Sequence, residues 1–385
     1  MTDLVVLSLE AWDGVWRRNQ HLVAGLLRTD PRLRVLFVEP PADPLHAARR
    51  RHVPARGKGL RRAEEQPGIR RDALWLYQPT KLLPRRLDPR VDERLAAAVV
   101  RQAKRLGFAA PLLWVNDPAG ASVLEATGWP ALYDITDDWV EAERTPAEHE
   151  RVLRDEALLM QLCREVVVCS PRLVQTKGAQ RPVTLIQNGV DLAAYQEPHQ
   201  RPGDLPDGPV AIYMGTLHTD RIDVDLCAAT AEALADRGRL VLVGPDALDP
   251  VDRERLEQAG AIITGPRHRD AVPAYLQHAD VLVVPHVVTP FTDSLDPIKV
   301  YEYRAVGRPV VSTPVAGFRG LDDPRVRLAQ GDDFAASVRA ALPAVTAFPD
   351  GADPDVPTWG QRVREMGTVL DRLARPDTER ATRSP

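Results

Sequence analysis

The sequence is poor in cysteine and has no long hydrophobic run. Three cysteines occur among 385 residues, each within an apolar stretch: Cys163, Cys169 and Cys227. So small and odd a number argues against a disulfide framework or a structural zinc site, and we expect three buried thiols. No apolar stretch approaches the roughly 20 residues that a membrane-spanning helix needs. These absences exclude an integral membrane protein built from spanning helices.

Several well-known binding motifs are also absent. The chain contains no G-x-x-x-x-G-K-[ST] loop, no G-x-G-x-x-G turn and no G-x-S-x-G elbow. Such motifs bring backbone N–H groups to a phosphate or present a serine nucleophile. Their absence argues against a P-loop nucleotidase, a nicotinamide dehydrogenase and a serine hydrolase. No D-x-D pair directly follows a predicted strand, so we expect no metal site.

The amino terminus is typical of a buried strand rather than a signal peptide. Its first three residues end in an acidic side chain, Asp3, and the apolar run from Leu4 to Leu9 is short and stops at Glu10. A secretory signal needs a basic start and a longer apolar region. We therefore expect a cytoplasmic protein.

What the chain does contain is an ordinary globular composition with an uneven charge. Apolar residues make up 44% and charged residues 27%, and a length of 385 residues favours two domains. The formal net charge is −4, yet residues 1–105 hold 22 Lys and Arg against 12 Asp and Glu, and residues 191–385 hold 21 against 30. The first part of the chain is basic and the last part acidic, which bears on its partners.

Short β-branched runs alternate with amphipathic segments along the whole chain, which predicts parallel sheets covered by helices. The alternation breaks at residues 197–209, where four prolines and two glycines predict a linker. We expect two Rossmann-like α/β domains, at 1–192 and 208–350, and a helix at 357–375. Tandem domains of this kind bind ligands in the cleft between them, at the carboxyl ends of the strands.

The segment from Ser294 to Thr313, SLDPIKVYEYRAVGRPVVST, carries the strongest functional signal. We expect Asp296 to cap a helix whose first residue is Pro297, and a helix N-terminus is a ready anion site. Lys299 in the first turn adds a positive charge beside a diphosphate. Glu302, one turn later on the same face, can accept hydrogen bonds from vicinal hydroxyls, as acidic residues do with ribose. The alternative is an ordinary capped helix with a surface Lys–Glu pair.

This segment resembles the donor-site signature of the GT-B glycosyltransferases of group 1, also called family 4, in its P-x-K-x-x-E-Y form. Bacterial polysaccharide and teichuronic-acid-type transferases share that form. Further segments match the family in order: Asn188-Gly-Val-Asp followed by Tyr195, YMGTL at 213–217, LVGP at 242–245 and Thr358-Trp359. The resemblance covers essentially the whole chain. It implies a GT-B fold with two domains facing across a cleft and a C-terminal helix that crosses back to the first domain.

The resemblance also implies roles for individual residues. Lys299 and Arg221 would stabilise charge on the leaving diphosphate, although Arg221 can also be an ordinary surface residue. The family's E-x7-E pattern expects a second glutamate where this chain has Ser294, which leaves the contact to the donor sugar open. Donor-binding candidates are Glu302, Gly215, Ser294, Asp296, Pro297, Ile298 and Gly14.

The loop after the first strand resembles the W-x-x-x-W-x-R opening of the same polysaccharide group. Its acceptor-binding candidates are Trp12, Asp13, Trp16 and Arg17. The two tryptophans can stack on sugar faces or pack at the domain rim, and we regard both as open. The arginines at 17 and 18 can face an anionic acceptor or solvent.

Two carboxylates follow strands of the first domain and can orient or deprotonate an acceptor hydroxyl: Asp117 and Asp137. Capping of the following helix is the alternative for Asp137 and its neighbour Asp138. His21 and His286 also lie near these loops, but a lone histidine in apolar surroundings is more often structural, so we assign them no role.

These observations predict a glycosyltransferase that moves a sugar, in the manner of a hexosyltransferase, from a nucleoside-diphosphate sugar to an acceptor hydroxyl. The family implies retention of configuration without a metal or cofactor, and we favour a UDP-sugar slightly over a GDP- or dTDP-sugar. The acceptor would be a glycan, a lipid-linked sugar or a small metabolite. A nucleotide-sugar epimerase or hydrolase on the same fold, and a non-catalytic sugar-binding protein, are the alternatives.

Residues 46–62 carry seven arginines and lysines and no acidic residue. Prolines and glycines interrupt the segment, so we expect a mobile loop. Such a cluster is attracted to an anionic membrane surface, which predicts peripheral attachment at the inner face of the membrane. A solvated arginine-rich loop is the alternative. Nucleic-acid binding is not expected, because no aromatic residues interleave with the basic ones.

Overall fold

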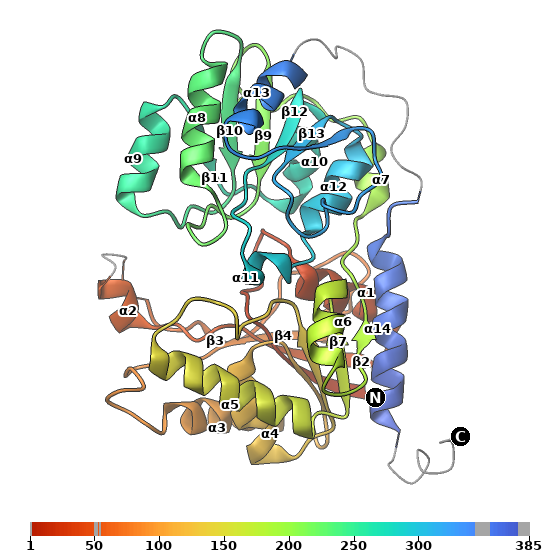
Figure 1. Ribbon diagram of the computed structural model, residues 1–385. Helices are drawn as coiled ribbons and strands as arrows, with labels where there is room; N and C mark the ends of the chain where they lie inside the picture. The colour runs from red at the N-terminus through yellow and green to blue at the C-terminus, as the bar shows by residue number, and fades with distance from the viewer. Residues whose placement is uncertain (1, 50–52, 54, 343–354, 376–385) are drawn as a thin grey trace. The chain divides into compact units, whose positions relative to one another are not determined.

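The computed structural model describes residues 2–49, 53, 55–342 and 355–375, and the chain divides into two compact units (Figure 1). The first unit comprises Met1–Gln187 and Gly360–Pro385, and the second comprises Asn188–Trp359. Within the described residues, no helix has the length and apolar character needed to cross a bilayer.

The first unit is built on an eight-stranded sheet in the order β3-β4-β2-β1-β5-β6-β7-β8. All neighbouring strands run parallel except β3 and β4, which are antiparallel. The strands are short apolar runs because both faces of a parallel sheet are covered. They are β1 Thr2–Leu7, β2 Leu33–Val38, β3 Gly59–Arg62, β4 Leu74–Gln78, β5 Leu112–Val115, β6 Ala131–Ile135, β7 Glu165–Val168 and β8 Thr184–Leu185.

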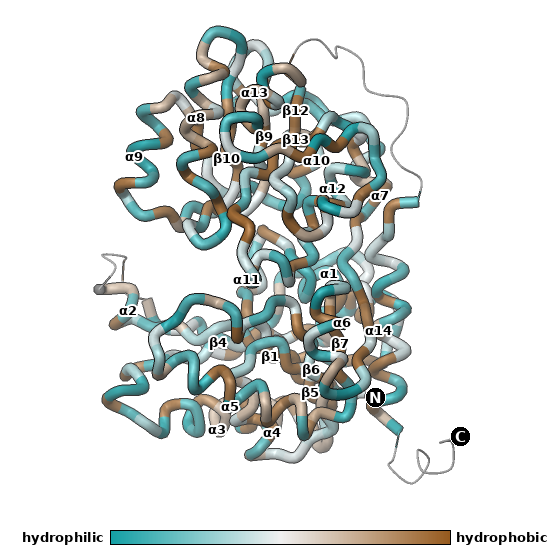
Figure 2. Tube along the Cα trace, in the orientation of Figure 1, coloured by the Kyte–Doolittle hydropathy of each residue, from teal (hydrophilic) through white to brown (hydrophobic). Residues whose placement is uncertain are grey.

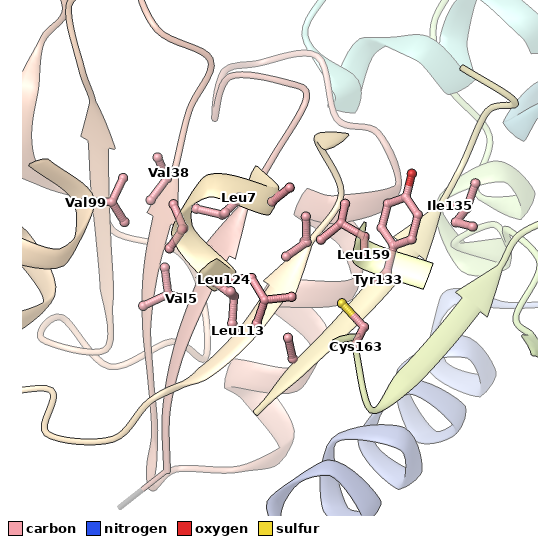
Figure 3. Packing of buried hydrophobic residues seen from close by; sticks show 14 of the residues in the cluster. Val5, Leu7, Val38, Val99, Leu113, Leu124, Tyr133, Ile135, Leu159 and Cys163 are labelled. Atoms are coloured by element: carbon pink, nitrogen blue, oxygen red, sulfur yellow. The ribbon is translucent and has the colours of Figure 1, made fainter. Parts of the chain in front are cut away.

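Helices cover both faces of this sheet. Figure 3 shows part of the core on one face, where Val99, Leu124 and Leu159 of the helices meet Val5 and Leu113 of the strands. The helices of the unit are α1 Arg18–Thr29, α2 Pro44–Arg49, α3 Val91–Arg105, α4 Ala121–Thr127, α5 Pro146–Leu162, α6 Pro171–Gly178 and α14 Trp359–Ala374, with a 3₁₀ turn at Pro118–Gly120.

The C-terminal helix α14 packs on α1 of the first unit. Gly25 of α1 lies so close to Val363 of α14 that a Cβ atom at this position would collide with the valine side chain. Arg372 of α14 also forms an ion pair with Glu165 at 3.0 Å. The last helix therefore belongs to the unit that contains the beginning of the chain.

The second unit has a six-stranded parallel sheet in the order β11-β10-β9-β12-β13-β14. Figure 2 shows apolar colours gathered on its strands and mostly hydrophilic colours on α9. Its strands are β9 Val210–Met214, β10 Arg239–Val243, β11 Ile262–Gly265, β12 Val281–Val284, β13 Val310–Ser312 and β14 Val326–Leu328. Its helices are α7 Leu192–Gln196, α8 Val224–Leu234, α9 Pro250–Gln258, α10 Val272–Gln277, α11 Pro290–Asp293, α12 Ile298–Val306 and α13 Asp332–Ala341, with a 3₁₀ turn at Arg269–Ala271.

The strand order of the second sheet reverses at β9. From this strand the chain adds β10 and β11 on one side and then returns to add β12, β13 and β14 on the other. Loops at the carboxyl ends of strands on either side of such a reversal separate and leave room for a ligand. The loops that follow β9 and β12 are therefore the expected position of a ligand-binding site in this unit.

Two expectations about the chain's organisation need correction. Along the chain, the boundary between the two units falls between Gln187 and Asn188. Residues 197–209 therefore do not join the units, because Tyr195 just before this segment and Leu205 within it are buried in the core of the second unit. The basic segment is not one mobile loop either. It begins in α2 and ends in β3, whose pairing with β4 uses its backbone hydrogen bonds.

A pair of glycines in the second unit supports a stability prediction. Gly215 and Gly244 follow β9 and β10 with φ angles of 152° and 151°, and a Cβ atom at Gly244 would collide with the Gly215 carbonyl oxygen. We expect Gly244→Ala to lower the free energy of unfolding by about 2 kcal/mol or more, because both the strain and the overlap are in the backbone. Urea unfolding measures this. Gly320→Ala is the matched control, since a Cβ there meets no atom within 4 Å; equal stability of the two variants would contradict the prediction.

Candidate functional site

The loop that precedes α12 is held by Asp296. Its carboxylate accepts hydrogen bonds from the backbone N–H of Asn188 at 2.5 Å and from the hydroxyl of Tyr301 at 2.7 Å. The Asn188 side chain donates back to the Asp296 carbonyl at 2.5 Å. The expectation that Asp296 caps the helix is wrong: Pro297 occupies the N-cap position, the helix begins at Ile298, and no side chain caps it. Asp296 instead ties the loop to the first residue of the unit.

Three side chains from different elements meet at the first turn of α12. The amine of Lys299 donates to the Tyr213 hydroxyl at 3.1 Å, lies 3.1 Å from Nε2 of His286, and sits 4.3 Å from the centre of the Tyr213 ring. Tyr213 and His286 are themselves 3.1 Å apart. Tyr213 lies near the end of β9, and His286 lies in the loop after β12. These are the two neighbouring strands at the strand reversal. We call these three residues the lysine cluster.

Burial and nearby cations disfavour the charged forms of the two basic groups in the lysine cluster. Burial, and then the nearby cation of Arg221, lower the pKa of Lys299 to about 7, against a weaker opposing effect of Glu302. Burial, followed by Lys299 and Arg221, lowers the pKa of His286 well below its usual value, so the imidazole is neutral. A bound anion would relieve both effects, because an opposite charge favours the protonated amine.

Gly215 allows the lysine to approach the loop after β9. A Cβ atom at this position would lie 3.1 Å from the Lys299 amine and 2.9 Å from the Tyr213 hydroxyl, and its φ of 152° is rare for other residues. Glycine thus leaves the amine room to move toward a ligand beside the backbone of this loop.

Glu302 lies one turn beyond Lys299 on α12. Its Oε1 accepts a hydrogen bond of 2.7 Å from the hydroxyl of Tyr195, which belongs to α7. Burial raises the pKa of Glu302, and the Tyr195 hydrogen bond and Lys299 oppose this effect. Among the described residues Tyr195 is its one hydrogen-bond donor, so Oε2 is available to accept hydrogen bonds from hydroxyl groups of a ligand.

Arg221 lies in the loop between β9 and α8, and its guanidinium carbon is 5.4 Å from the centre of the Phe291 ring. The carboxylate of Asp223, two residues later, accepts from the N–H of Leu226 and so caps α8. The effect of Arg221 on the pKa of Lys299 shows that the two cations act on the same region. The structure therefore brings together Arg221, Gly215, Lys299 and Glu302.

Ser294 is placed differently from the sequence expectation. It is buried at the end of α11, and its hydroxyl donates to the Phe291 carbonyl at 2.7 Å. This hydroxyl is directed to the protein's own backbone. Pro297 and Ile298, half-buried at the start of α12, remain beside Lys299 and Glu302.

Four residues that shape this site were given no role from the sequence: His286, Tyr213, Tyr195 and Asn188. Two sequence features could have indicated a role for three of them. His286 comes two residues after a buried strand, at the edge where ligands bind in α/β sheets. Asn188 and Tyr195 stood in a matched motif but had been given no role.

Comparisons with known proteins agree with this geometry. Residues 208–343 match the family model described as Glycosyl transferases group 1. This match covers most of the second unit, and the fold is of the GT-B class. A Bacillus subtilis (strain 168) relative, TuaH, described as a candidate teichuronic acid biosynthesis glycosyltransferase, is 25% identical over 251 residues. That match covers 60% of this chain and 63% of the relative, so the chain spans less than two thirds of the relative's length.

Two solved structures share the fold of this chain. Anabaena Alr3699/HepE in complex with UDP has a TM-score of 0.61 at 14% identity and covers 97% of this chain and 100% of its own. The catalytic domain of starch synthase IV from Arabidopsis thaliana, bound to ADP and acarbose, has a TM-score of 0.60 at 11% identity, with 97% and 98% covered. The expected fold class is confirmed.

In the first unit of this GT-B chain, the two tryptophans pack on the protein itself. Trp12 contacts the Trp16 ring edge-on at 5.6 Å between centroids and the Phe37 ring at 5.0 Å, and Trp16 contacts His21 at 5.2 Å. Both indoles are half-buried. Packing is therefore their observed role, and only the remaining exposed part is open to an acceptor.

The other residues of that loop also have local partners. The exposed carboxylate of Asp13 accepts from the N–H of Val15 at 2.8 Å, across the turn that contains Gly14. Arg17 lies at the N-cap of α1 and forms an ion pair with Glu10 at 3.3 Å. The next residue, Arg18, is neither solvated nor free to meet an acceptor, because it is buried and paired with Asp134 at 3.1 Å.

Asp117 caps the 3₁₀ turn that follows β5. Its carboxylate accepts from the N–H of Ala119 at 2.9 Å, and burial raises its pKa, which Arg151 and Arg85 partly oppose. A raised pKa suits a proton acceptor, while the hydrogen bond restricts its orientation.

Asp137 and Asp138 do not cap the following helix, contrary to the alternative expectation. That helix, α5, begins at Pro146 after Thr145. Asp137 accepts from the Thr136 hydroxyl at 2.9 Å, and Asp138 is buried in an ion pair with Lys177 at 2.8 Å. Among the described residues, no group of three or more His, Cys, Asp and Glu side chains is arranged to hold a metal ion.

Proposed function

We propose that the protein is a glycosyltransferase that moves a sugar from a nucleoside-diphosphate sugar to an acceptor hydroxyl. The observation that carries this proposal is the lysine cluster: an amine in contact with Tyr213 and His286, whose pKa Arg221 lowers more than Glu302 raises it, one turn before Glu302. The family match over residues 208–343 and the transferase relative support the same activity.

In the proposed reaction, Lys299 and Arg221 stabilise the charge that develops on the leaving diphosphate. Fixed cations in a poorly solvated site are most effective where charge builds up in the transition state. Glu302 holds the nucleotide through ribose hydroxyls. Two cations on the diphosphate supply the charge that a metal ion would otherwise provide, so we propose a metal-independent hexosyl transfer that uses no cofactor.

We propose retention of the anomeric configuration, as the family implies. The acceptor hydroxyl attacks on the face that the diphosphate is leaving, and the departing phosphate takes up the proton. No enzymic base is then strictly needed, which agrees with the hydrogen bond that already engages Asp117. The chain's contribution is positioning and charge stabilisation.

A UDP-sugar remains the favoured donor, and the UDP complex of the Anabaena structure supports it. The ADP complex of starch synthase IV keeps other bases open. The acceptor is proposed to be a glycan, a lipid-linked sugar or a small metabolite in surface-polysaccharide or glycoconjugate synthesis, and the TuaH relative favours a surface polymer. A cytoplasmic enzyme attached to the inner face of the membrane through residues 46–62 fits such an acceptor.

Replacement of Glu302 tests the donor site. We expect Glu302→Ala to weaken binding of the best nucleoside diphosphate by about 1–3 kcal/mol, because charge-assisted hydrogen bonds to the ribose are lost. Isothermal titration with a panel of nucleoside diphosphates measures this and identifies the base. Glu254→Ala, on the exposed surface of α9, is the control. An unchanged Kd for Glu302→Ala would remove this residue from the site.

Product analysis separates the competing functions. A transferase forms a new glycoside only when an acceptor is present, whereas a hydrolase or an epimerase converts the nucleotide sugar without one. A sugar-binding protein leaves the nucleotide sugar intact in both cases.

A further inference from the structure

Exposed apolar side chains gather on two segments of the first unit. Leu45 lies on α2, and Leu82, Leu83 and Leu87 lie in the connection between β4 and α3. Leu82 and Leu87 are the most exposed of them, at 64% and 67%. A soluble surface usually carries such side chains singly, so a group of them marks an interaction site.

The two segments lie side by side. The N–H of Lys81 donates to the Ala42 carbonyl at 2.8 Å, the N–H of Ala42 donates to the Pro79 carbonyl at 2.9 Å, and the amine of Lys81 pairs with Asp43 at 2.8 Å. These contacts hold the start of α2 against the chain that leads to the exposed leucines. We call Leu45, Leu82, Leu83 and Leu87 the leucine patch.

Basic residues accompany the leucine patch. Arg86 is exposed in the connection between β4 and α3, and Arg56 and Lys58 are exposed just before β3, where the N–H of Gly57 donates to the Thr80 hydroxyl at 2.9 Å. The nearby acidic groups already have cationic partners: Asp43 pairs with Lys81, and Asp88 pairs with Arg94. The exposed charge of this face is therefore positive. The side chain of Arg49, together with Arg50, Arg51, His52 and Pro54, lies outside the described residues.

Part of the basic segment is engaged by the protein itself. Arg61 on β3 forms an ion pair of 2.7 Å with the buried Glu39, and Arg62 lies over the Trp75 ring at 5.0 Å. The charge of Arg61 is balanced by Glu39, so Arg61 contributes less to long-range attraction than the sequence suggested, whereas Arg62 keeps its charge. Electrostatic attraction by this segment is thus weaker than a count of its basic residues indicates, and a second source of affinity is needed for stable attachment.

We infer that the leucine patch inserts into the interfacial region of an anionic lipid bilayer, with Arg56, Lys58 and Arg86 at the level of the lipid phosphates. Apolar side chains flanked by basic ones, and by few free acidic ones, match a surface that is anionic outside and apolar below. The patch supplies the apolar term that charge alone lacks, and part of the binding therefore resists salt. This inference concerns attachment and does not depend on the proposed transfer reaction.

Vesicle flotation of the full chain tests this inference. The probes are vesicles of phosphatidylcholine alone and of phosphatidylcholine with phosphatidylglycerol, each at low and high salt. We expect wild-type protein to float with the anionic vesicles at low salt and to retain part of this binding at high salt. The triple variant Leu82→Ser, Leu83→Ser and Leu87→Ser should lose at least about tenfold in partition coefficient, because each leucine gives up apolar burial. Arg56→Ser with Lys58→Ser should remove salt-sensitive binding.

The matched control is Leu153→Ser with Leu162→Ser, which replaces exposed leucines of α5 in the same unit. It should float like the wild type. No flotation of the wild type with anionic vesicles, or equal binding by the triple and control variants, would overturn the inference. So would reversible dimerisation in sedimentation velocity that the triple variant abolishes, because the patch would then join two copies of the chain.

Nucleoside-diphosphate binding serves as the folding control for every variant, since the leucine patch lies in the other unit from the lysine cluster. It also separates the two proposals. Flotation without nucleotide binding supports the attachment and refutes the donor site, and nucleotide binding without flotation does the reverse.

Discussion

Lys299→Ala lowers kcat by about 100- to 1000-fold and changes KM for the nucleotide sugar much less. The expected size is that of removing one fixed donor or cation from a site where transition-state charge develops. A group that acts mainly on the leaving diphosphate contributes more to the transition state than to the bound substrate, so its loss appears in kcat. Steady-state kinetics with varied nucleotide sugar measure both constants.

Two further variants define the role of this amine. Arg221→Ala should act in the same direction, because its cation serves the same region. Tyr213→Phe removes one hydrogen bond to the amine but leaves the charge, so it should have a much smaller effect on kcat. Near-wild-type kcat in both Lys299→Ala and Arg221→Ala would refute the diphosphate assignment.

Nucleoside-diphosphate binding weakens by about 100-fold between about pH 7.5 and about pH 9.5. In the free protein the pKa of Lys299 is about 7, so the amine is mostly neutral above this pH. A bound diphosphate raises that pKa, and the complex then holds one more proton than its separate partners. Affinity therefore falls by up to about tenfold per pH unit above about pH 7 until the pKa of the complex is reached.

The other groups that face Lys299 do not account for this dependence. Burial holds His286 neutral over the whole range, and burial raises the pKa of Tyr213 above the range. The phosphates of the ligand complete their ionisation at about pH 6. Isothermal titration in buffers of different ionisation enthalpy measures Kd and proton uptake together.

Lys299→Arg is the control for this prediction, because a guanidinium remains charged and removes the proton uptake. Its Kd should be nearly constant from about pH 7.5 to about pH 9.5. A wild-type Kd that is equally constant would show that the amine is already protonated in the empty site.

The sequence predicted the regular parts of the fold because parallel strands are recorded locally as short apolar runs. β5, Leu112–Val115, and β12, Val281–Val284, are such runs. The strands β3 and β14 are not, because their side chains are polar or exposed. Their pairing with a neighbour is set by backbone hydrogen bonds, which leave no pattern in the sequence.

The candidate site was predicted as far as it lies on one helix. Lys299 and Glu302 share α12, so their spacing placed them on one face. His286 was rejected because a single histidine shows no partner in the sequence, and its contact with Tyr213 joins residues 73 positions apart. Arg18 was misjudged for the same reason: Asp134, which buries its charge, is 116 positions away.

The hydrogen bond between Tyr195 and Glu302 shows what the tyrosine hydroxyl in the motif at residues 188–195 contributes to the site. The tyrosine hydroxyl helps keep the buried carboxylate ionised, against the burial that raises its pKa. A phenylalanine would leave the glutamate with a higher pKa, so it would hold a proton more readily and accept hydrogen bonds from sugar hydroxyls less readily. The hydroxyl oxygen of Tyr195, 107 positions earlier in the chain, therefore adjusts the basicity of Glu302, the group proposed to bind the nucleotide.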